Sequence, residues 1–250
     1  MGRVEEYLLR KMEDEGALHI TLIDPEKLPP RKAMEVAVEA EAGGTAAIMV
    51  GGSTLASNQE LDEVVKAIKS AVKVPVILFP NNISGISRYA DAIWFMSLLN
   101  SSSTYYLIEA QALAAALINK YGLEAIPMGY LIVGEGCTVG YIGHARLISY
   151  EYPKIAAGYA LAAVKLGMRF IYLEAGSGAK EPIPPEMIST VKKAIQSPLI
   201  VGGGIRDASA AERAVRAGAD IIVQGTLVER VDCIRESIYE IVEYIRKVKR

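Results

Sequence analysis

Eight short apolar runs recur along the chain, and most of them are separated by segments with helical patterning. The runs cover residues 17–23, 45–51, 74–80, 91–97, 125–133, 169–175, 198–204 and 220–226. They are continuous rather than alternating, which is typical of parallel strands buried on both faces. Eight such strands in 250 residues match the usual size of a (β/α)8 barrel. We therefore predict an α/β fold, a TIM barrel, as a single domain over residues 1–250.

The connection between the third and fourth runs is unusually short. Only ten residues, NNISGISRYA (81–90), join these runs, whereas a crossover that contains a helix generally needs at least about 10–12 residues. We expect the third helix to be missing and replaced by an extended segment or a single turn, which would open a groove along the barrel. A short distorted helix without a groove is the alternative. A doubly wound sheet is disfavoured because no G-x-G-x-x-G follows the first run.

The composition narrows the class of protein. Lys and Arg number 27 against 29 Asp and Glu, so the charge gives no support for nucleic-acid binding. The two cysteines, Cys137 and Cys233, have no metal spacing and cannot form a disulfide framework. A reducing, cytoplasmic location is therefore expected. Residues 4–16 are too charged for a signal peptide and precede the first run as a helix that closes the barrel floor. No apolar stretch approaches 18 residues, so we expect no membrane span, with peripheral contact left open.

Glycine-rich turns follow the last three apolar runs. Barrel enzymes place their chemistry at the carboxyl ends of strands, and many bind phosphate after strands seven and eight. Glycine lets backbone N–H groups approach a ligand closely. A phosphate cup is the reading we favour, and a set of tight turns is the alternative. The residues of these turns are Gly176, Gly178, Gly202, Gly203, Gly204, Gly225 and Thr226.

One carboxylate stands directly before such a turn, in YLEAGSGA (172–179). Tyr172 and Glu174 alternate on the sixth run and so point to the same side. If that side is inward, Glu174 can accept a proton from a hydroxyl of a small phosphorylated substrate, while Tyr172 donates a hydrogen bond to it. A glutamate paired with a core arginine is the alternative. The two histidines, His19 and His144, are isolated and are expected to satisfy local hydrogen bonds.

Candidate ligands for a metal and for phosphate follow the first two apolar runs. Asp24 stands at the tip of the first run, and Mg²⁺ typically binds through one or two carboxylates with substrate phosphates and water. Lys27 could contact the same phosphates, and a helix N-cap is the alternative role for Asp24. Ser53, beside two glycines, is either a second oxygen near the metal or a cap of the next helix. The glycine-rich stretch 134–153 is expected to form a functional loop over the barrel mouth.

Five pieces of the sequence together resemble the geranylgeranylglyceryl phosphate synthase family, which includes the bacterial heptaprenylglyceryl phosphate synthases. They occur in family order over nearly the whole chain. The resemblance implies a modified barrel without its third helix and a Mg²⁺-dependent prenyltransferase of membrane ether-lipid biosynthesis. In that reaction the C3 hydroxyl of sn-glycerol 1-phosphate attacks C1 of geranylgeranyl diphosphate, and diphosphate leaves. The pieces are IDPEK (23–27), GGST (51–54), YLEAGSGA (172–179), VGGGI (201–205) and VQGT (223–226).

The resemblance also implies roles for individual residues. Asp24 and Ser53 match the magnesium positions, and Lys27 is our own addition as a contact for the diphosphate. Glu174 and Tyr172 are the implied catalytic pair. The missing helix would open a trough for the prenyl tail, lined from residues 91–99 and a helix over 103–118. The glycerol 1-phosphate positions are matched by Tyr172, Leu173, Glu174, Ala175, Gly176, Ser177, Gly178, Gly203, Gly204, Gly225 and Thr226.

Several alternatives remain at this level. Tyr105 and Tyr106 are candidates for the trough wall, with simple packing as the other reading. The chain contains no DD pair, which argues against a helical, chain-elongating prenyl synthase. A barrel isomerase or lyase acting on a phosphorylated sugar, and a non-enzymatic metabolite-binding barrel, would share the phosphate site. The accepted prenyl length is not determined, and the family implies a homo-oligomer, either a dimer or a hexamer.

Overall fold

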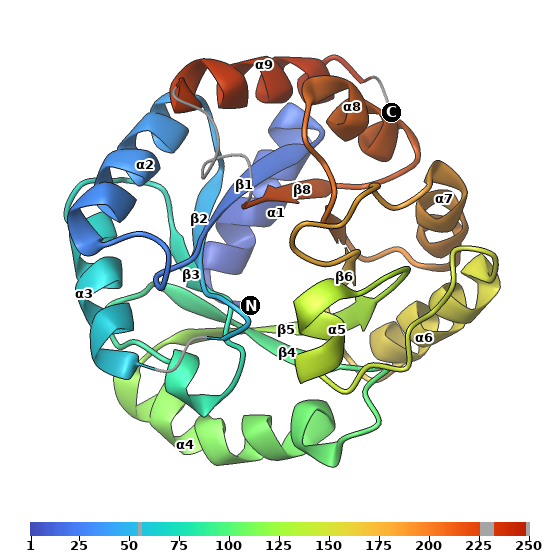
Figure 1. Cartoon of the computed structure of the whole chain (residues 1–250), viewed down its shortest axis with the longest axis horizontal. Helices are drawn as coiled ribbons and strands as arrows, with labels where there is room; N and C mark the ends of the chain where they lie inside the picture. Colours follow the sequence, from blue (N-terminus) through green and yellow to red (C-terminus); the bar gives the residue numbers. More distant parts are fainter. Residues whose placement is uncertain (55–56, 226–232, 249–250) are drawn as a thin grey trace.

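The computed structural model is a closed barrel in which eight parallel strands pair in chain order, and β1 also pairs with β8 (Figure 1). It describes residues 1–54, 57–225 and 233–248. Each strand nearly coincides with one of the apolar runs, so the predicted TIM barrel is confirmed. The strands are β1 (Leu18–Ile23), β2 (Ala47–Val50), β3 (Val76–Leu78), β4 (Ala92–Leu98), β5 (Glu124–Ile132), β6 (Phe170–Glu174), β7 (Leu199–Gly202) and β8 (Ile221–Gln224).

Helices surround the barrel, and their starts follow local sequence rules (Figure 1). The Asp207 side chain accepts a hydrogen bond from Ala210 N at 2.7 Å and so caps α8. Within the described residues, no helix is long and apolar enough to cross a membrane. The helices of the ring are α2 (Pro30–Ala42), α3 (Asn58–Lys69), α4 (Ala110–Tyr121), α6 (Pro153–Lys165), α7 (Pro185–Ala194), α8 (Ala208–Arg216) and α9 (Ile234–Arg246).

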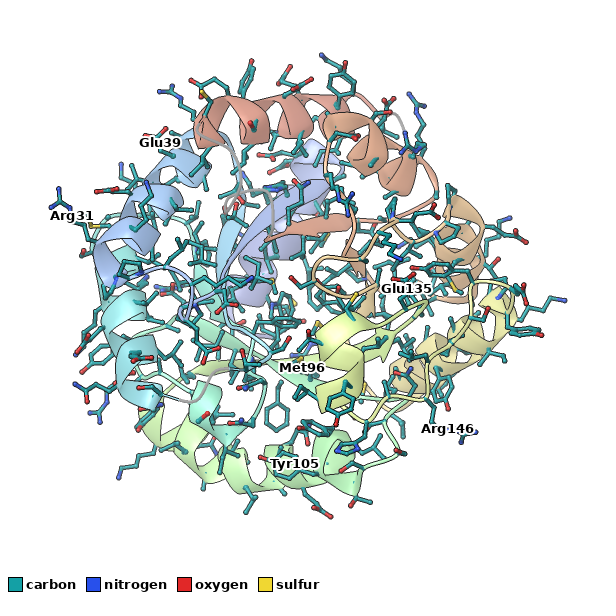
Figure 2. All side chains as sticks on the ribbon, viewed as in Figure 1. Arg31, Glu39, Met96, Tyr105, Glu135 and Arg146 are labelled. Atoms are coloured by element: carbon teal, nitrogen blue, oxygen red, sulfur yellow. The ribbon has the colours of Figure 1, made fainter. Side chains whose placement is uncertain are left out.

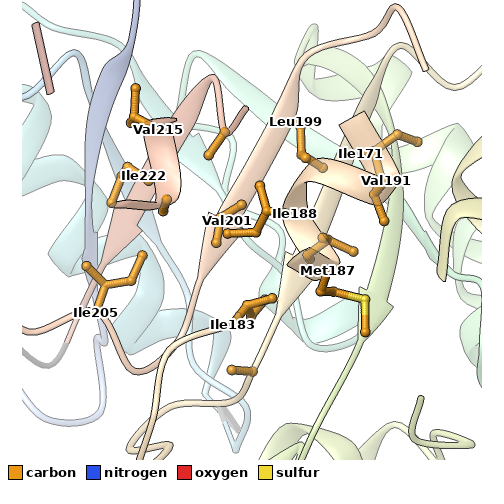
Figure 3. Close-up of a cluster of buried hydrophobic side chains, with 14 of the residues drawn as sticks. Ile171, Ile183, Met187, Ile188, Val191, Leu199, Val201, Ile205, Val215 and Ile222 are labelled. Carbon is orange, nitrogen blue, oxygen red and sulfur yellow. The ribbon is translucent and has the colours of Figure 1, made fainter. Parts of the chain in front are cut away.

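The core has an inner and an outer layer because successive strand residues face opposite sides. On β6, Phe170 and Tyr172 lie in the barrel interior, whereas Ile171 and Leu173 pack outward against helices. Figure 3 shows part of the outer layer, where Val201 of β7 lies beside Ile188 of α7. This alternation directs Glu174, the last residue of β6, to the same side as Tyr172.

The third helix of the ring is absent, as the sequence predicts. Residues 79–91 are all described, and their one helical element is the 3₁₀ turn η1 (Ile83–Gly85). Asn58 of α3 donates hydrogen bonds to the carbonyls of Ser84 (3.2 Å) and Ile86 (2.7 Å), which holds this connection against α3. The place between α3 and α4 in the ring is therefore filled by a thin segment instead of a helix.

The helix α1 (Arg3–Glu15) closes the opposite end of the barrel, which confirms the predicted floor. Val4 and Leu8 are buried in the cluster that fills the barrel interior. The Glu124 carboxylate, at the start of β5, accepts hydrogen bonds from the backbone N–H groups of Val4 (2.7 Å) and Glu5 (2.8 Å). Among the described residues, α1 thus covers the end of the barrel opposite to the one at which the strands finish.

Candidate active site at the barrel mouth

A pocket opens at the carboxyl ends of the strands and continues into the groove left by the missing helix. Its mouth is lined by residues of the strand-end turns, and its far part lies between the outer face of β4 and α4. Residues at the mouth include Asp24, Ser53, Glu174, Ser177, Gly203, Gly204 and Gly225. Residues of the groove include Ile86, Ile93, Phe95, Tyr106, Ala110, Ala114 and Ile118.

Glu174 is a buried carboxylate that faces this pocket, with 7 % of its surface exposed. Its Oε1 accepts a hydrogen bond from Gly176 N at 2.6 Å. Burial raises the pKa of Glu174 above its usual range, and the Gly176 N–H and the Tyr172 hydroxyl oppose that shift. Among the described residues no arginine pairs with Glu174. Its burial, its place at the pocket and its raised pKa are those of a candidate proton acceptor.

Tyr172 lies beside Glu174 within a group of three aromatic rings. Its ring stacks on Phe79 at 5.5 Å between centroids and meets Tyr130 edge-on at 5.2 Å. A side chain at position 202 would place its Cβ 2.1 Å from the Tyr172 hydroxyl, so Gly202 makes room for that hydroxyl. Burial and the nearby Glu174 charge raise the pKa of Tyr172, which keeps the hydroxyl protonated and able to donate.

The glycine turns converge on this carboxylate. Gly176 (φ 104°) and Gly203 (φ 84°) have left-handed backbones that favour glycine. A Cβ at position 203 would lie 2.6 Å from Glu174 Oε1 and 2.8 Å from Gly176 N. Only glycine lets the turn after β7 approach the turn after β6 this closely. Gly204 and Gly225 line the same mouth, while Thr226 lies outside the described residues.

The predicted glycerol phosphate residues of β6 divide between two surfaces. Ser177 lies at the pocket wall. The side chains of Leu173 and Ala175 belong to the outer core, where they face helices. These two residues can contact a ligand only through their backbone atoms, because their side chains point away from the barrel axis.

Asp24 stands across the mouth, at the end of β1. Its Oδ1 accepts a hydrogen bond from Glu26 N at 3.1 Å, and α2 begins only after Pro29, so Asp24 does not cap that helix. A Cβ at position 52 would lie 2.5 Å from Asp24 Oδ1, so the second glycine of GGST admits the carboxylate. Lys27 Nζ lies 3.8 Å from Asp24 Oδ2. Asp24, Lys27 and Gly52 line the pocket.

Ser53 lies near Asp24 on the pocket wall. Its backbone carbonyl accepts a hydrogen bond from Asn81 Nδ2 at 3.3 Å. The cap of α3 is Ser57, whose side chain accepts from Glu60 N at 3.2 Å. Ser53 therefore does not cap α3, and its hydroxyl is available at the mouth.

The groove wall contains Tyr106 but not Tyr105. Tyr106 belongs to the π-helical turn η2 (Tyr105–Glu109), which precedes α4 in place of the regular helix expected from residue 103. Ser97 Oγ donates to the Leu107 carbonyl at 2.7 Å, so a β4 side chain supports the wider turn. Tyr105 packs edge-on against Tyr106 at 5.1 Å and lies at the start of the α4 segment (Figure 2). Simple packing therefore describes Tyr105.

The stretch 134–153 lies over the mouth, as expected for a functional loop. It forms the short helix α5 (Cys137–Ile142), and its residues Val139 and Ile142 line the pocket. Met96 of β4, which packs with the inner core cluster, lines the same pocket (Figure 2). The loop thus contributes apolar contacts where the mouth meets the groove.

Two residues of the mouth, Phe79 and Tyr130, are not among those predicted from the sequence. Phe79 directly follows β3, so the rule that strand ends carry function could have identified it. Tyr130 lies inside β5, in an apolar run without a distinguishing pattern. Its contacts with Tyr172, its register partner on β6, and with Phe79 depend on the tertiary structure.

Comparisons with known proteins agree with this geometry. The model of the PcrB family matches residues 9–245. The chain belongs to the PcrB family. It is 53% identical to the geranylgeranylglyceryl phosphate synthase of Thermococcus gammatolerans, over 100% of this chain and 98% of that protein. The enzyme of the same name from Methanobrevibacter smithii is 51% identical over 99% of this chain and 98% of the relative. The family resemblance found in the sequence is thus confirmed.

One solved structure is especially close. It is the crystal structure of (S)-3-O-geranylgeranylglyceryl phosphate synthase from Thermoplasma acidophilum in complex with its substrate sn-glycerol-1-phosphate. It matches with a TM-score of 0.94 and 44% sequence identity, over 99% of this chain and 100% of that chain. The structural similarity therefore extends over nearly the whole chain.

Proposed function

We propose that the protein is a geranylgeranylglyceryl phosphate synthase that joins the C3 hydroxyl of sn-glycerol 1-phosphate to geranylgeranyl diphosphate. The observation that carries the proposal is the single pocket surface that joins the Glu174 carboxylate, the glycine turns and an apolar groove. Relatives with this name match the full chain at half identity or more. An isomerase or lyase of phosphorylated sugars would not need the apolar groove, because its substrate has no long apolar tail.

The acceptor binds at the glycine turns. Backbone N–H groups of the turns after β6, β7 and β8 hold its phosphate, and the hydroxyl then falls near Glu174. The hydroxyl oxygen forms a bond to C1 of the prenyl group while the bond from C1 to the diphosphate oxygen breaks. Glu174 takes the hydroxyl proton, and its charge stabilises the positive character that develops on C1. Orienting both substrates in this way is worth roughly 7–11 kcal/mol of barrier.

The diphosphate end of the pocket suits Mg²⁺. Asp24 and Ser53 offer hard oxygen donors at one side of the mouth, and no group of three or more His, Cys, Asp or Glu occurs among the described residues. A lone carboxylate fits a magnesium ion that arrives with the diphosphate. When bound, the ion would neutralise charge on the leaving group. Lys27, beside Asp24, is positioned to contact the same phosphates.

The reaction is tested directly with the purified enzyme. Labelled sn-glycerol 1-phosphate is supplied with prenyl diphosphates of several lengths, with Mg²⁺ or with chelator. We expect Mg²⁺-dependent label in the lipid phase, with the highest kcat/KM for the geranylgeranyl substrate. Absence of lipid-soluble label with every chain length would contradict the proposed function. A higher kcat/KM for a longer chain would correct the substrate but leave the reaction class intact.

Replacing Asp24 with asparagine is expected to raise the Mg²⁺ concentration needed for half-maximal rate by at least about tenfold, because the diphosphate side loses its carboxylate. The measurement is a Mg²⁺ titration of the initial rate. Glu26→Gln is the matched control, since Glu26 is an exposed carboxylate two residues away that accepts a hydrogen bond from Thr54 Oγ1. Equal Mg²⁺ requirements in the two variants would remove Asp24 from the metal site.

Replacing Ala114 with phenylalanine is expected to fill the groove. Ala114 is buried on α4 and lines the groove, so a large ring there shortens the space for the tail. The ratio of kcat/KM for geranylgeranyl over geranyl diphosphate should fall by roughly 10–200-fold, the range that pocket shape supplies. Ala112→Phe, on the exposed face of the same helix, should leave the ratio unchanged. An unchanged ratio in Ala114→Phe would place the tail elsewhere.

A further inference from the structure

A line of buried polar side chains, none of which has a role in the chemistry proposed above, runs from β1 to the pocket wall, where Gln224 and Ile205 lie. His19 of β1 lies with Nδ1 at 3.1 Å from Thr45 Oγ1 and Nε2 at 3.0 Å from Gln224 Oε1. Gln224, the last residue of β8, donates from Nε2 to the Ile205 carbonyl at 3.0 Å. Thr21 Oγ1 donates to Thr45 Oγ1 at 3.1 Å. All four of these side chains, His19, Thr21, Thr45 and Gln224, are buried.

The chemistry of the partners determines where each proton lies. The Ile205 carbonyl can only accept, so the amide nitrogen of Gln224 must face it. The amide oxygen then faces His19, and Nε2 of the imidazole must carry the proton. Burial lowers the pKa of His19 to about 4, so the ring is neutral at pH 7 and Nδ1 is an acceptor. The Thr45 hydroxyl accepts from Thr21 Oγ1 at 3.1 Å. Its single proton is within reach of three acceptors, His19 Nδ1 (3.1 Å) and the carbonyls of His19 (3.1 Å) and Ala47 (3.2 Å). From His19 Nε2 onwards, each donor points towards the Ile205 carbonyl.

The line ends at the phosphate-binding part of the mouth. Ile205 directly follows Gly203 and Gly204, whose backbones are left-handed with φ of 84° and 71°. Gln224 directly precedes Gly225, which lines the mouth from β8. The main chain of Gln224 therefore leads into the turn after β8 at Gly225, and its side chain is hydrogen-bonded to the end of the turn after β7 at Ile205. A shift of this amide would change the distance between the two turns.

We propose that Gln224, oriented by His19, is a positioning residue that sets the spacing of the turns after β7 and β8 and thereby the affinity for the acceptor's phosphate, an inference that rests on the proposed function. The pair does not touch the reacting atoms. Its loss therefore raises the KM for sn-glycerol 1-phosphate while leaving kcat and the KM for the prenyl diphosphate nearly unchanged. A side chain with a purely structural role would lower thermal stability without this selective effect.

Two variants of the full chain separate the interactions. Gln224→Leu removes both hydrogen bonds, whereas Gln224→Glu keeps the acceptor for His19 Nε2 and loses the donor to the Ile205 carbonyl. Both should raise the KM for sn-glycerol 1-phosphate by about tenfold, the effect of one buried hydrogen bond. Lys192→Met is the control. It removes the ion pair of Lys192 with Asp220 (2.7 Å) at the other end of β8, and should lower Tm with unchanged KM.

Nitrogen-15 NMR of the imidazoles provides a readout that does not depend on turnover. The chain has two histidines, so His144→Gln assigns the His19 signals. We expect the neutral form with the proton on Nε2 in the wild type, a proton kept on Nε2 in Gln224→Glu, and a changed ring signal in Gln224→Leu. Titration with inorganic phosphate should give about tenfold weaker binding in both variants.

These arms separate failure of the inference from failure of the proposed function. If the wild type forms no prenyl lipid, the proposed function fails, and the NMR and phosphate titrations still decide the role of Gln224. If both Gln224 variants fold, judged by Tm, and bind sn-glycerol 1-phosphate and phosphate like the wild type, the positioning role is wrong. A proton on Nδ1 of His19 in the wild type would overturn it as well.

Discussion

Replacing Glu174 with glutamine is expected to lower kcat by roughly 10²–10⁴-fold, the usual contribution of a general base. The amide has the same shape and keeps an oxygen that can accept from Gly176 N, so the turn should keep its structure. It cannot take the hydroxyl proton, and it carries no charge to stabilise the developing cation at C1. The KM for sn-glycerol 1-phosphate should change little, because the glycine turns hold the phosphate.

The control for this substitution is Glu181→Gln, which changes an exposed glutamate on the segment after the same turn. Steady-state kinetics with both substrates varied distinguish the two variants. Retention of wild-type turnover in Glu174→Gln would remove Glu174 from the chemistry, whatever the other variants do.

The raised pKa of Glu174 gives this position a pH signature. Because the base must be ionised, kcat/KM should rise with pH through a pKa above the usual carboxyl value of 4.5. The sign for stability is opposite. A carboxyl group whose folded pKa is raised stabilises the fold below its unfolded pKa, and this contribution is lost as pH rises through the folded pKa. Glu174→Gln should therefore have a Tm at pH 7 equal to or above that of the wild type.

Replacing Gly203 with alanine is expected to raise the KM for sn-glycerol 1-phosphate by roughly 10²-fold. Two costs combine at this position. The left-handed backbone, with φ of 84°, is unfavourable for any side chain, by about 1–3 kcal/mol. The new Cβ would also lie 2.6 Å from Glu174 Oε1 and 2.8 Å from Gly176 N. The turns after β6 and β7 must then separate, which disrupts the phosphate cup and displaces the carboxylate.

A second glycine isolates the steric part of this effect. Gly16, at the end of α1, has nearly the same φ of 85°, and a Cβ there would meet no atom within 4 Å. Gly16→Ala should therefore lower Tm through backbone strain alone and leave the kinetics of the wild type unchanged. A wild-type KM in Gly203→Ala would show that the two turns do not need their close approach to hold the acceptor.

The elements of the barrel could be predicted because their causes are local. Each strand is a continuous apolar run, since a parallel strand buried on both faces needs apolar residues at every position. The missing helix follows from a connection too short to contain one. The turns after β6 and β7 need left-handed backbones, and the glycines at 176 and 203 indicate these turns in the sequence. These features depend on residues that are close in the chain.

The arrangement of the site depends on residues that are distant in the chain. The rings of Phe79 and Tyr130 contact Tyr172 because the register of β5 on β6 pairs Tyr130 with Tyr172, and because closing the barrel brings Phe79, at the end of β3, to the same rings. The same closure pairs β1 with β8 and so turns an isolated histidine, His19, into the partner of Gln224. Periodicity and turn chemistry therefore specify the strands and their glycine turns. Which side chains meet at the mouth is decided by strand register, because a shift of one residue would turn Glu174 from the pocket to the outer core.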